Sequence, residues 1–204
     1  REQLTEGTVE SLMYIAKEIA LGIKRKIGEK IIEQHVDKLR TALDGTIVAL
    51  SLTVEQRDPY TAGHQRRVSQ LACAIADEMG LSHEQIEGVK MAGIVHDIGK
   101  MHIPAEILSR PGKLTADEFN IVRSHAQVGY DILKGIEFPW PVADIVHQHH
   151  EKMDGSGYPM GLSNGDILME ARILCVADVV EAMASHRPYR PALGMDMALE
   201  EISK

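Results

Sequence analysis

Apolar residues recur every three or four positions through much of this chain, and that spacing limits how it can fold. Before the first proline, Pro59, the series begins with Leu12, Ile15 and Ile19. Side chains at such intervals lie on one face of an α-helix. No stretch shows the sustained alternation of apolar and polar residues that a half-buried strand requires, and aromatic residues make up only 4% of the chain. The sequence therefore predicts an all-α fold.

Local signals predict where the later helices begin. Ser82 with Gln85, and Thr115 with Glu118, form capping boxes, in which side chains bond the first free backbone amides of a helix. Thr61 is the expected N-cap of an earlier helix. A loop rich in Gly, Pro, Ser and Asn interrupts the helical pattern between residues 150 and 168. After the first stretch, helices are expected over residues 61–80, 82–97, 115–125, 126–134, 141–150, 170–185 and 195–203.

The N-terminal stretch can serve a purpose outside the core. Residues 1–40 are interpreted as an amphipathic helical linker or dimerisation segment, through which the chain would form a homodimer, and residues 41–204 as a separate domain. The alternative is that the first stretch supplies core helices of that domain. Because the chain begins with Arg1 instead of Met, we expect it to belong to a longer protein with an upstream sensory domain.

Composition excludes several classes of partner. The net charge of −8 provides no basic surface for long nucleic acid. The sequence has no signal peptide and no apolar run near the roughly 20 residues that cross a bilayer, so we predict a cytoplasmic protein without membrane contact. Cys73 and Cys175 lie within apolar helical patterns and are expected to be small core residues without a disulfide.

Imidazole and carboxylate side chains occur near the apolar-to-polar boundaries of several predicted helices. The candidate metal ligands are His64, His96, Asp97, His125, His149, His150 and Asp178. Nitrogen and oxygen donors without thiolate suit Fe, Mn or Zn, and seven ligands are too many for one ion. Two ions that share a bridging carboxylate would use them all, and centres of that kind hydrolyse phosphate esters.

Each of these residues taken singly has a simpler interpretation, because most such side chains lie on surfaces or cap helices. Asp178 is the most informative, since it interrupts the apolar run from Ile173 to Val180. A carboxylate buried there needs a cation or several donors, and the structural alternative is a salt bridge to an arginine. Lys100, Arg187 and Arg190 flank the donors and are candidates to hold phosphate oxygens, although a lone cation is more often a solvated surface charge.

Longer motifs surround these candidates. They are Asp58-Pro-Tyr-Thr-Ala-Gly-His64 with Arg67-Val68, His96-Asp-Ile-Gly-Lys100, His125, the run from His149 to Pro159, Ala177-Asp178, and Arg187-Pro-Tyr-Arg190. These motifs resemble those of the HD-GYP family, within the HD superfamily of metal-dependent phosphohydrolases. The resemblance covers about residues 40–200. It implies an HD-domain helical bundle, with residues 41–204 as the catalytic domain.

The resemblance also implies an activity and roles for particular residues. The substrate would be cyclic di-GMP, cleaved to pGpG and in some relatives onward to GMP. One metal ion would be held by His64, His96, Asp97 and Asp178, and Asp97 would bridge to a second ion held by His125, His149 and His150. Lys100, Arg187 and Arg190 would hold substrate phosphates, and Tyr158 would border the pocket. The two divalent ions are expected to be Fe or Mn, with Zn, Ni, Co or Mg as alternatives.

One departure from some relatives limits the expected number of ions. Those relatives carry Glu four residues before the first histidine and bind a third metal with it. Here that position is Tyr60, which offers no carboxylate, so we expect two ions.

The expected mechanism is attack by a metal-bridging hydroxide, with Asp97 and Lys100 as the catalytic residues. Two other functions remain open at this point. One is a different HD-type nucleotide phosphohydrolase, and the other is a catalytically weak signalling module that binds a cyclic dinucleotide.

Overall fold

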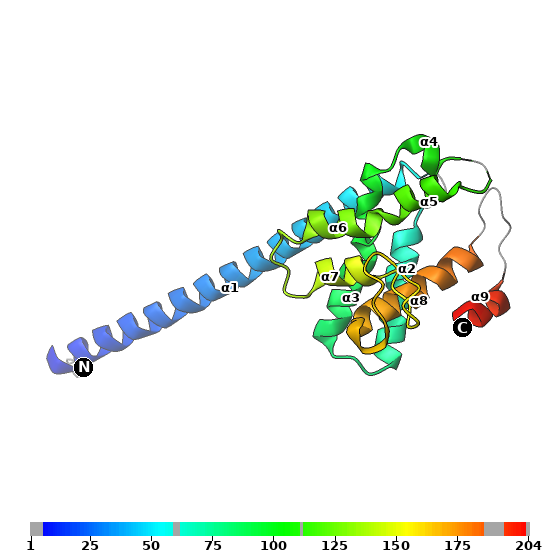
Figure 1. The fold of residues 1–204 in the computed structure, drawn as a ribbon. Helices are drawn as coiled ribbons and strands as arrows, with labels where there is room; N and C mark the ends of the chain where they lie inside the picture. Colours follow the sequence, from blue (N-terminus) through cyan, green and yellow to red (C-terminus); the bar gives the residue numbers. More distant parts are fainter. Residues whose placement is uncertain (1–5, 59–61, 111, 186–193, 203–204) are drawn as a thin grey trace. The chain divides into compact units, whose positions relative to one another are not determined.

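The computed structural model describes residues 6–58, 62–110, 112–185 and 194–202 (Figure 1). Within these ranges every regular element is helical, and the one β-type pairing is an isolated bridge between Asp154 and Ser163. The all-α prediction is confirmed. The elements are α1 (Glu6–Glu55), α2 (His64–Glu78), α3 (His83–Val95), η1 (Ile98–His102), α4 (Ala105–Leu108), α5 (Ala116–Arg123), α6 (His125–Leu133), α7 (Val142–Gln148), η2 (Asn164–Asp166), α8 (Met169–Ala184) and α9 (Met195–Ile202).

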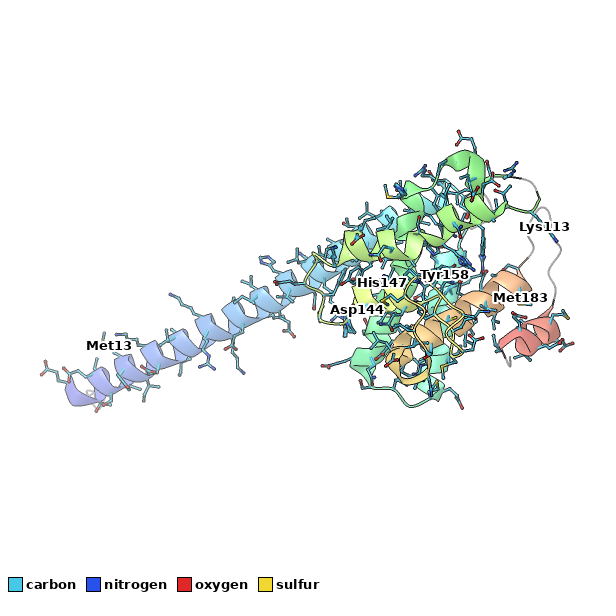
Figure 2. All side chains as sticks on the ribbon, in the orientation of Figure 1. Met13, Lys113, Asp144, His147, Tyr158 and Met183 are labelled. Atoms are coloured by element: carbon cyan, nitrogen blue, oxygen red, sulfur yellow. The ribbon has the colours of Figure 1, made fainter. Side chains whose placement is uncertain are left out.

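Internal contacts divide the chain into two units, Arg1–Thr46 and Ile47–Lys204. In the first unit α1 is unbroken, and its apolar side chains remain exposed, as with Ile19 at 57% and Met13 at 69% (Figure 2). A helix normally buries such a stripe against another element. The structure thus contains the expected N-terminal helical segment, while its amphipathic character and the predicted domain boundary after residue 40 stay predictions.

The second unit has one core, formed mainly by α2, α3, α7 and α8. Helix α2 packs against α3 and α8, α3 packs against α7 and α8, and α6 packs against η1 and α7. Small side chains allow this close approach: Ala72, Ala92 and Ala177 are fully buried alongside Ile145 and Leu174. The helices of this core carry most of the candidate ligands at their ends.

The two predicted capping boxes, Ser82 with Gln85 and Thr115 with Glu118, are both present. The start of α2 differs from the prediction. Its N-cap is Gly63, at φ 71°, where we expected Thr61, a position outside the described residues. That prediction was wrong.

A carboxylate from another helix replaces the missing cap of α2. Glu55, the last residue of α1, accepts hydrogen bonds from the backbone N–H of Gly63 at 2.9 Å and of Gln65 at 3.0 Å. A helix N-terminus favours a negative charge of this kind. The contact fixes the first turn of α2, and the first residue of that turn is His64.

None of the described helices combines the length and apolarity that crossing a membrane would demand. Cys73 and Cys175 are both half-buried and free.

Candidate metal centre

The seven candidate ligands converge from five separate segments of the second unit. Six of them form two groups in which the ligand atoms of each group lie within 4.8 Å of one another. The first cluster is His64, His96 and Asp178, and the second cluster is His125, His149 and His150. The side chains of His64, His96, His125 and His149 are all buried.

Asp97, the seventh candidate, lies between the two clusters. Its Oδ2 is 3.5 Å from His96 Nε2 and 3.9 Å from His64 Nε2, whereas its Oδ1 is 3.6 Å from His125 Nε2. One oxygen thus faces each cluster. Burial by itself raises the pKa of this carboxyl, but nearby Lys100 and the histidines outweigh burial and hold the pKa well below its ordinary value. Asp97 is therefore an anion placed to serve both clusters.

Lys100 supplies the nearest fixed positive charge. Its Nζ is 2.8 Å from Asp97 Oδ2 and 3.6 Å from Asp58 Oδ2. Burial lowers the pKa of Lys100, but the carboxylates of Asp97 and Asp58 raise it further, to a net value above the ordinary one. Lys100 stays protonated at neutral pH and neutralises part of the negative charge between the clusters.

In the first cluster, carboxylates surround an imidazole. His64 Nε2 is 3.1 Å from Asp178 Oδ1, and His96 Nε2 is 3.9 Å from the same oxygen. Burial lowers the pKa of His64, but hydrogen bonds to Asp178 and Glu181 raise it to about 9. Burial by itself raises the pKa of Asp178. The hydrogen bond with His64 and the nearby histidines outweigh burial and bring this pKa far below its ordinary value. The cluster therefore attracts positive charge.

Glu181 supports His64 from behind and was not among the sequence candidates. Its carboxylate accepts a hydrogen bond from His64 Nδ1, while Arg67 Nε at 2.7 Å and Ser185 Oγ at 2.6 Å also donate to it. Burial raises the pKa of Glu181, and these donors lower it to about 2. A carboxylate on the far nitrogen of a ligand histidine fixes the ring and increases its basicity. The available signal was its position one helical turn after Asp178.

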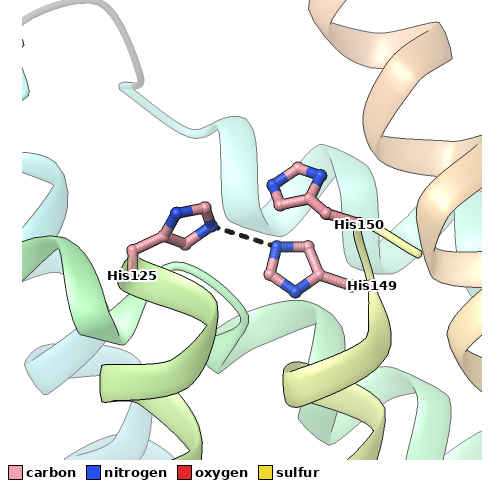
Figure 3. Close-up of side chains that lie close together, drawn as sticks. All are labelled: His125, His149 and His150. Atoms are coloured by element: carbon pink, nitrogen blue, oxygen red, sulfur yellow. Dashed lines mark hydrogen bonds between the residues drawn. The ribbon is translucent and has the colours of Figure 1, made fainter. Parts of the chain in front are cut away.

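The second cluster contains imidazoles alone (Figure 3). Two of its histidines, together with His96 of the first cluster, are oriented in the same way. In each ring the Nδ1–H donates a hydrogen bond to the backbone carbonyl oxygen three residues earlier. These bonds join His96 to Gly93 at 2.8 Å, His125 to Val122 at 2.7 Å and His149 to Val146 at 2.6 Å. Since a carbonyl can only accept, the Nε2 atom of each neutral ring carries a lone pair.

These lone pairs face one another and need a positive partner. His125 Nε2 is 3.2 Å from His149 Nε2, and His96 Nε2 is buried without a hydrogen-bond partner among the described residues. Burial lowers the pKa of His125 and of His149, and it lowers the pKa of His150 to about 3, so protonation does not supply that charge at neutral pH. A divalent cation at each cluster would resolve the conflict. The residues present therefore fit the two ions expected from the sequence.

Two glycines let backbone segments approach the clusters closely. A Cβ at Gly99 would overlap the carbonyl oxygen of His125 and lie 2.7 Å from the nitrogen of Gly129, so η1 and α6 can touch only at a glycine. A Cβ at Gly157 would lie 2.6 Å from the carbonyl oxygen of His150. The first contact sets the separation of Asp97 from His125, because Asp97 is the N-cap of η1 and His125 begins α6.

The loop after α7 is held by Glu151, another residue that sequence reasoning missed. Its carboxylate accepts backbone hydrogen bonds from Met160 at 2.7 Å, Gly161 at 3.2 Å and Leu162 at 2.9 Å. These bonds hold the segment that follows Tyr158. The Tyr158 ring lies 4.7 Å from the His150 ring, centroid to centroid, at the border of the second cluster.

The remaining candidates are placed as follows. Arg187 and Arg190, predicted to bind phosphates, and Tyr60 lie outside the described residues. His147 lies on α7 (Figure 2). It belongs to neither cluster. It stacks on Tyr130 and bonds Gln127 Oε1 at 2.9 Å.

Comparison with known proteins gives a family match and a set of curated relatives. Residues 49–204 match the HD domain family. RpfG, a cyclic di-GMP phosphodiesterase response regulator of Xanthomonas campestris, is 44% identical over 156 residues, which are 76% of this chain and 41% of that protein. A cyclic di-GMP phosphodiesterase of Thermotoga maritima is 39% identical over 176 residues, or 85% of this chain and 48% of that protein.

A third relative acts on a different cyclic dinucleotide. The 3'3'-cGAMP-specific phosphodiesterase 3 of Vibrio cholerae is 36% identical over 198 residues, which are 97% of this chain and 43% of that protein. The chain thus spans less than half the length of each of these three relatives.

Solved structures share the fold. Bd1817, an HDG"Y"P protein from Bdellovibrio bacteriovorus, has a TM-score of 0.56 at 20% identity and covers 68% of this chain and 44% of its own. The Vibrio cholerae phosphodiesterase V-cGAP3 has a TM-score of 0.57 at 16% identity, with 77% of this chain and 43% of its own covered. The family match and the curated relatives together show that this chain belongs to the HD domain family, in its HD-GYP branch.

Proposed function

We propose that the second unit hydrolyses the phosphodiester bonds of cyclic di-GMP, giving pGpG and then GMP. The observation that carries the proposal is the carboxylate of Asp97, which faces the first cluster with one oxygen and the second cluster with the other. The names of the relatives RpfG and the Thermotoga maritima enzyme support the same substrate.

Two divalent ions, with Fe or Mn as the first choice, would be held by the first and second clusters and shared through Asp97. Such ions lower the pKa of a bound water and offset the charge of the phosphate under attack. Three features of the chain favour the binding of these ions: the Nε2 lone pairs of the buried histidines, the negative charge of Asp178, and the hydrogen bond between Glu181 and His64.

Lys100 would then stabilise charge on the substrate instead of transferring a proton. Its pKa is raised, so it holds its proton throughout the neutral range, and its Nζ already lies 2.8 Å from Asp97. Tyr158 would border the substrate as a neutral phenol, because burial raises its pKa. The predicted phosphate contacts of Arg187 and Arg190 remain part of the proposal.

The test is cleavage of cyclic di-GMP by the purified chain loaded with Mn²⁺ or, under anaerobic conditions, Fe²⁺. We expect pGpG, followed by GMP, on ion-exchange chromatography, and no product after chelation. The relative from Vibrio cholerae makes 3'3'-cGAMP a necessary second substrate in the same assay.

Three other results would each contradict the proposal. Hydrolysis of nucleoside triphosphates without cleavage of cyclic di-GMP would indicate another HD-type phosphohydrolase. Much faster cleavage of 3'3'-cGAMP than of cyclic di-GMP would mean that 3'3'-cGAMP is the substrate. Saturable binding of cyclic di-GMP without product in any metal would indicate a binding module.

We also propose that segment 6–46 pairs with a second copy of the chain in the cytoplasm and connects the catalytic unit to a sensory domain. A second copy carries the same exposed stripe, including Ile19, Ile23 and Ile27, and pairing would bury both stripes. Sedimentation equilibrium of the full chain should give a dimer, and Ile23→Glu should give a monomer. A monomeric wild-type chain at micromolar concentration would contradict this.

A further inference from the structure

Arg123 is a cation beside the second cluster that the proposed chemistry has not used. It is the last residue of α5, two positions before His125. Its guanidinium carbon lies 4.6 Å from the centre of the Phe119 ring and 5.0 Å from the centre of the Tyr158 ring. Tyr158 in turn lies against His150. Aromatic contacts therefore hold the Arg123 guanidinium next to the metal centre.

The polar atoms of Arg123 lack the partners that other arginines have. Its Nε is buried without a hydrogen-bond partner among the described residues, and no described acidic side chain lies within ion-pair distance of it. By contrast, Arg67 pairs with Glu181, and Arg110 pairs with Glu118. An unpartnered guanidinium is unusual in a chain with a net charge of −8. Leaving the buried Nε–H unbonded costs free energy that an incoming anion would recover.

We propose that Arg123 binds the phosphate of the cyclic dinucleotide that is not being cleaved. This inference rests on the proposed function. A cyclic dinucleotide carries two phosphates, and the phosphate that is not at the clusters can bind a further cation besides the Arg187 and Arg190 of the proposed function. Lys100 is engaged with Asp97 and Asp58. The two aromatic rings hold the guanidinium carbon 4.6 Å and 5.0 Å from their centres, and a guanidinium carries paired N–H donors that match two phosphate oxygens.

A neutral variant separates this role from a structural one. Arg123→Gln should raise the concentration of cyclic di-GMP at half-saturation about tenfold or more, because it removes a charge-assisted hydrogen bond. The value of kcat and the metal content per chain should change less than about twofold, since no ligand is lost. Arg123→Lys, which keeps the charge without the fork, should fall between wild type and Arg123→Gln. Arg66→Gln, which removes an exposed arginine from α2, is the matched control.

Probe compounds identify the group that Arg123 contacts. Cyclic di-AMP keeps both phosphates and changes both bases, and its binding, measured as inhibition or by calorimetry, should weaken by the same factor. Bis(p-nitrophenyl) phosphate carries one phosphate, and its hydrolysis should be unaffected.

Three outcomes would overturn the inference. Weaker binding of cyclic di-GMP but not of cyclic di-AMP would mean that Arg123 contacts guanine. An equal loss in the hydrolysis of bis(p-nitrophenyl) phosphate would mean that Arg123 only positions Tyr158 and His150. Unchanged binding of both dinucleotides would mean that it contacts neither. A wild-type chain that neither binds nor cleaves cyclic dinucleotides would refute the proposed function before any variant is made.

Discussion

The first and second clusters each bring three ligand atoms together, but they differ in charge. The first contains Asp178 and has Glu181 behind His64, so two carboxylates surround one imidazole. The second contains imidazoles alone, two of which are oriented by backbone carbonyl oxygens. The pKa values respond in opposite directions: that of His64 rises to about 9, while burial lowers that of His150 to about 3.

This difference shows how one carboxylate can contribute to two clusters of unequal charge. A cation at the first cluster meets negative charge already in place, whereas a cation at the second gains mainly neutral nitrogen ligands. Asp97 faces each cluster with one carboxylate oxygen, and among the described residues the second cluster contains no carboxylate of its own. The first cluster should therefore bind its ion more tightly.

Removing the shared carboxylate should have the largest effect on this arrangement. Asp97→Asn is expected to lower kcat about 10³-fold or more, because a neutral amide offers one oxygen acceptor and removes the charge nearest to Lys100. Steady-state kinetics with cyclic di-GMP measures the loss. Asp77→Asn, an exposed position on α2, should be unaffected. Activity within tenfold of wild type in Asp97→Asn would mean that the two clusters do not act together.

Changing the separation of the clusters should have the next largest effect. Gly99→Ala is expected to destabilise the second unit by about 3 kcal/mol, because the new Cβ overlaps the His125 carbonyl oxygen and one of the two backbones must move. Thermal unfolding followed by circular dichroism measures this. Gly165→Ala is the control, since a Cβ there meets nothing within 4 Å. Equal melting temperatures for the two variants would contradict the close approach of η1 and α6.

Glu181→Gln should affect one cluster only. The amide keeps the shape but removes the charge behind His64, so we expect affinity for the more tightly bound ion to fall about 10–100-fold. Affinity for the second ion should change less than about threefold. Titration of the ion-free protein with Mn²⁺ resolves the two affinities, and exposed Glu137→Gln is the control. A greater loss at the weaker site would reverse the assignment.

A further effect is on the pH dependence of stability in the ion-free protein. The pKa of His150 falls to about 3 on folding, so the unfolded chain binds the extra proton, and stability is lost as pH falls below about 6.5. The pKa of His64 rises to about 9, so its contribution is lost as pH rises from about 6.5 through 9. Each slope is at most about 1.4 kcal/mol per pH unit.

Urea unfolding between pH 5 and 9 should therefore show a maximum near neutral pH. His150→Gln should reduce the slope on the acid side, where His125 and His149 still contribute, and His64→Gln should reduce the slope on the alkaline side. An unchanged acid side in His150→Gln would mean that this ring is not buried in its neutral form.

The sequence predicted the parts of the fold that local chemistry decides. The capping boxes at Ser82 and Thr115 begin helices as expected, because a capping residue and its partner lie within one turn. The start of α2 was mispredicted because its cap comes from Glu55, on another helix. A contact between residues of different elements leaves no local signal around Thr61.

The candidate site shows the same division. The seven candidate metal ligands were recognisable from motif order, and the structure brings them close together. The residues that orient them were missed, because the roles of Glu181 and Gly99 depend on which helices pack side by side. Arg123 was missed for a related reason: its partners Phe119 and Tyr158 belong to different segments.

Calorimetric titration of the ion-free protein with Mn²⁺ tests the central claim most directly. We predict that two ions bind per chain with distinct affinities. In Asp178→Asn only the affinity for the more tightly bound ion should fall, because that variant removes a charge from the first cluster alone. A single ion per chain at saturation, or equal weakening of both sites in Asp178→Asn, would contradict the account.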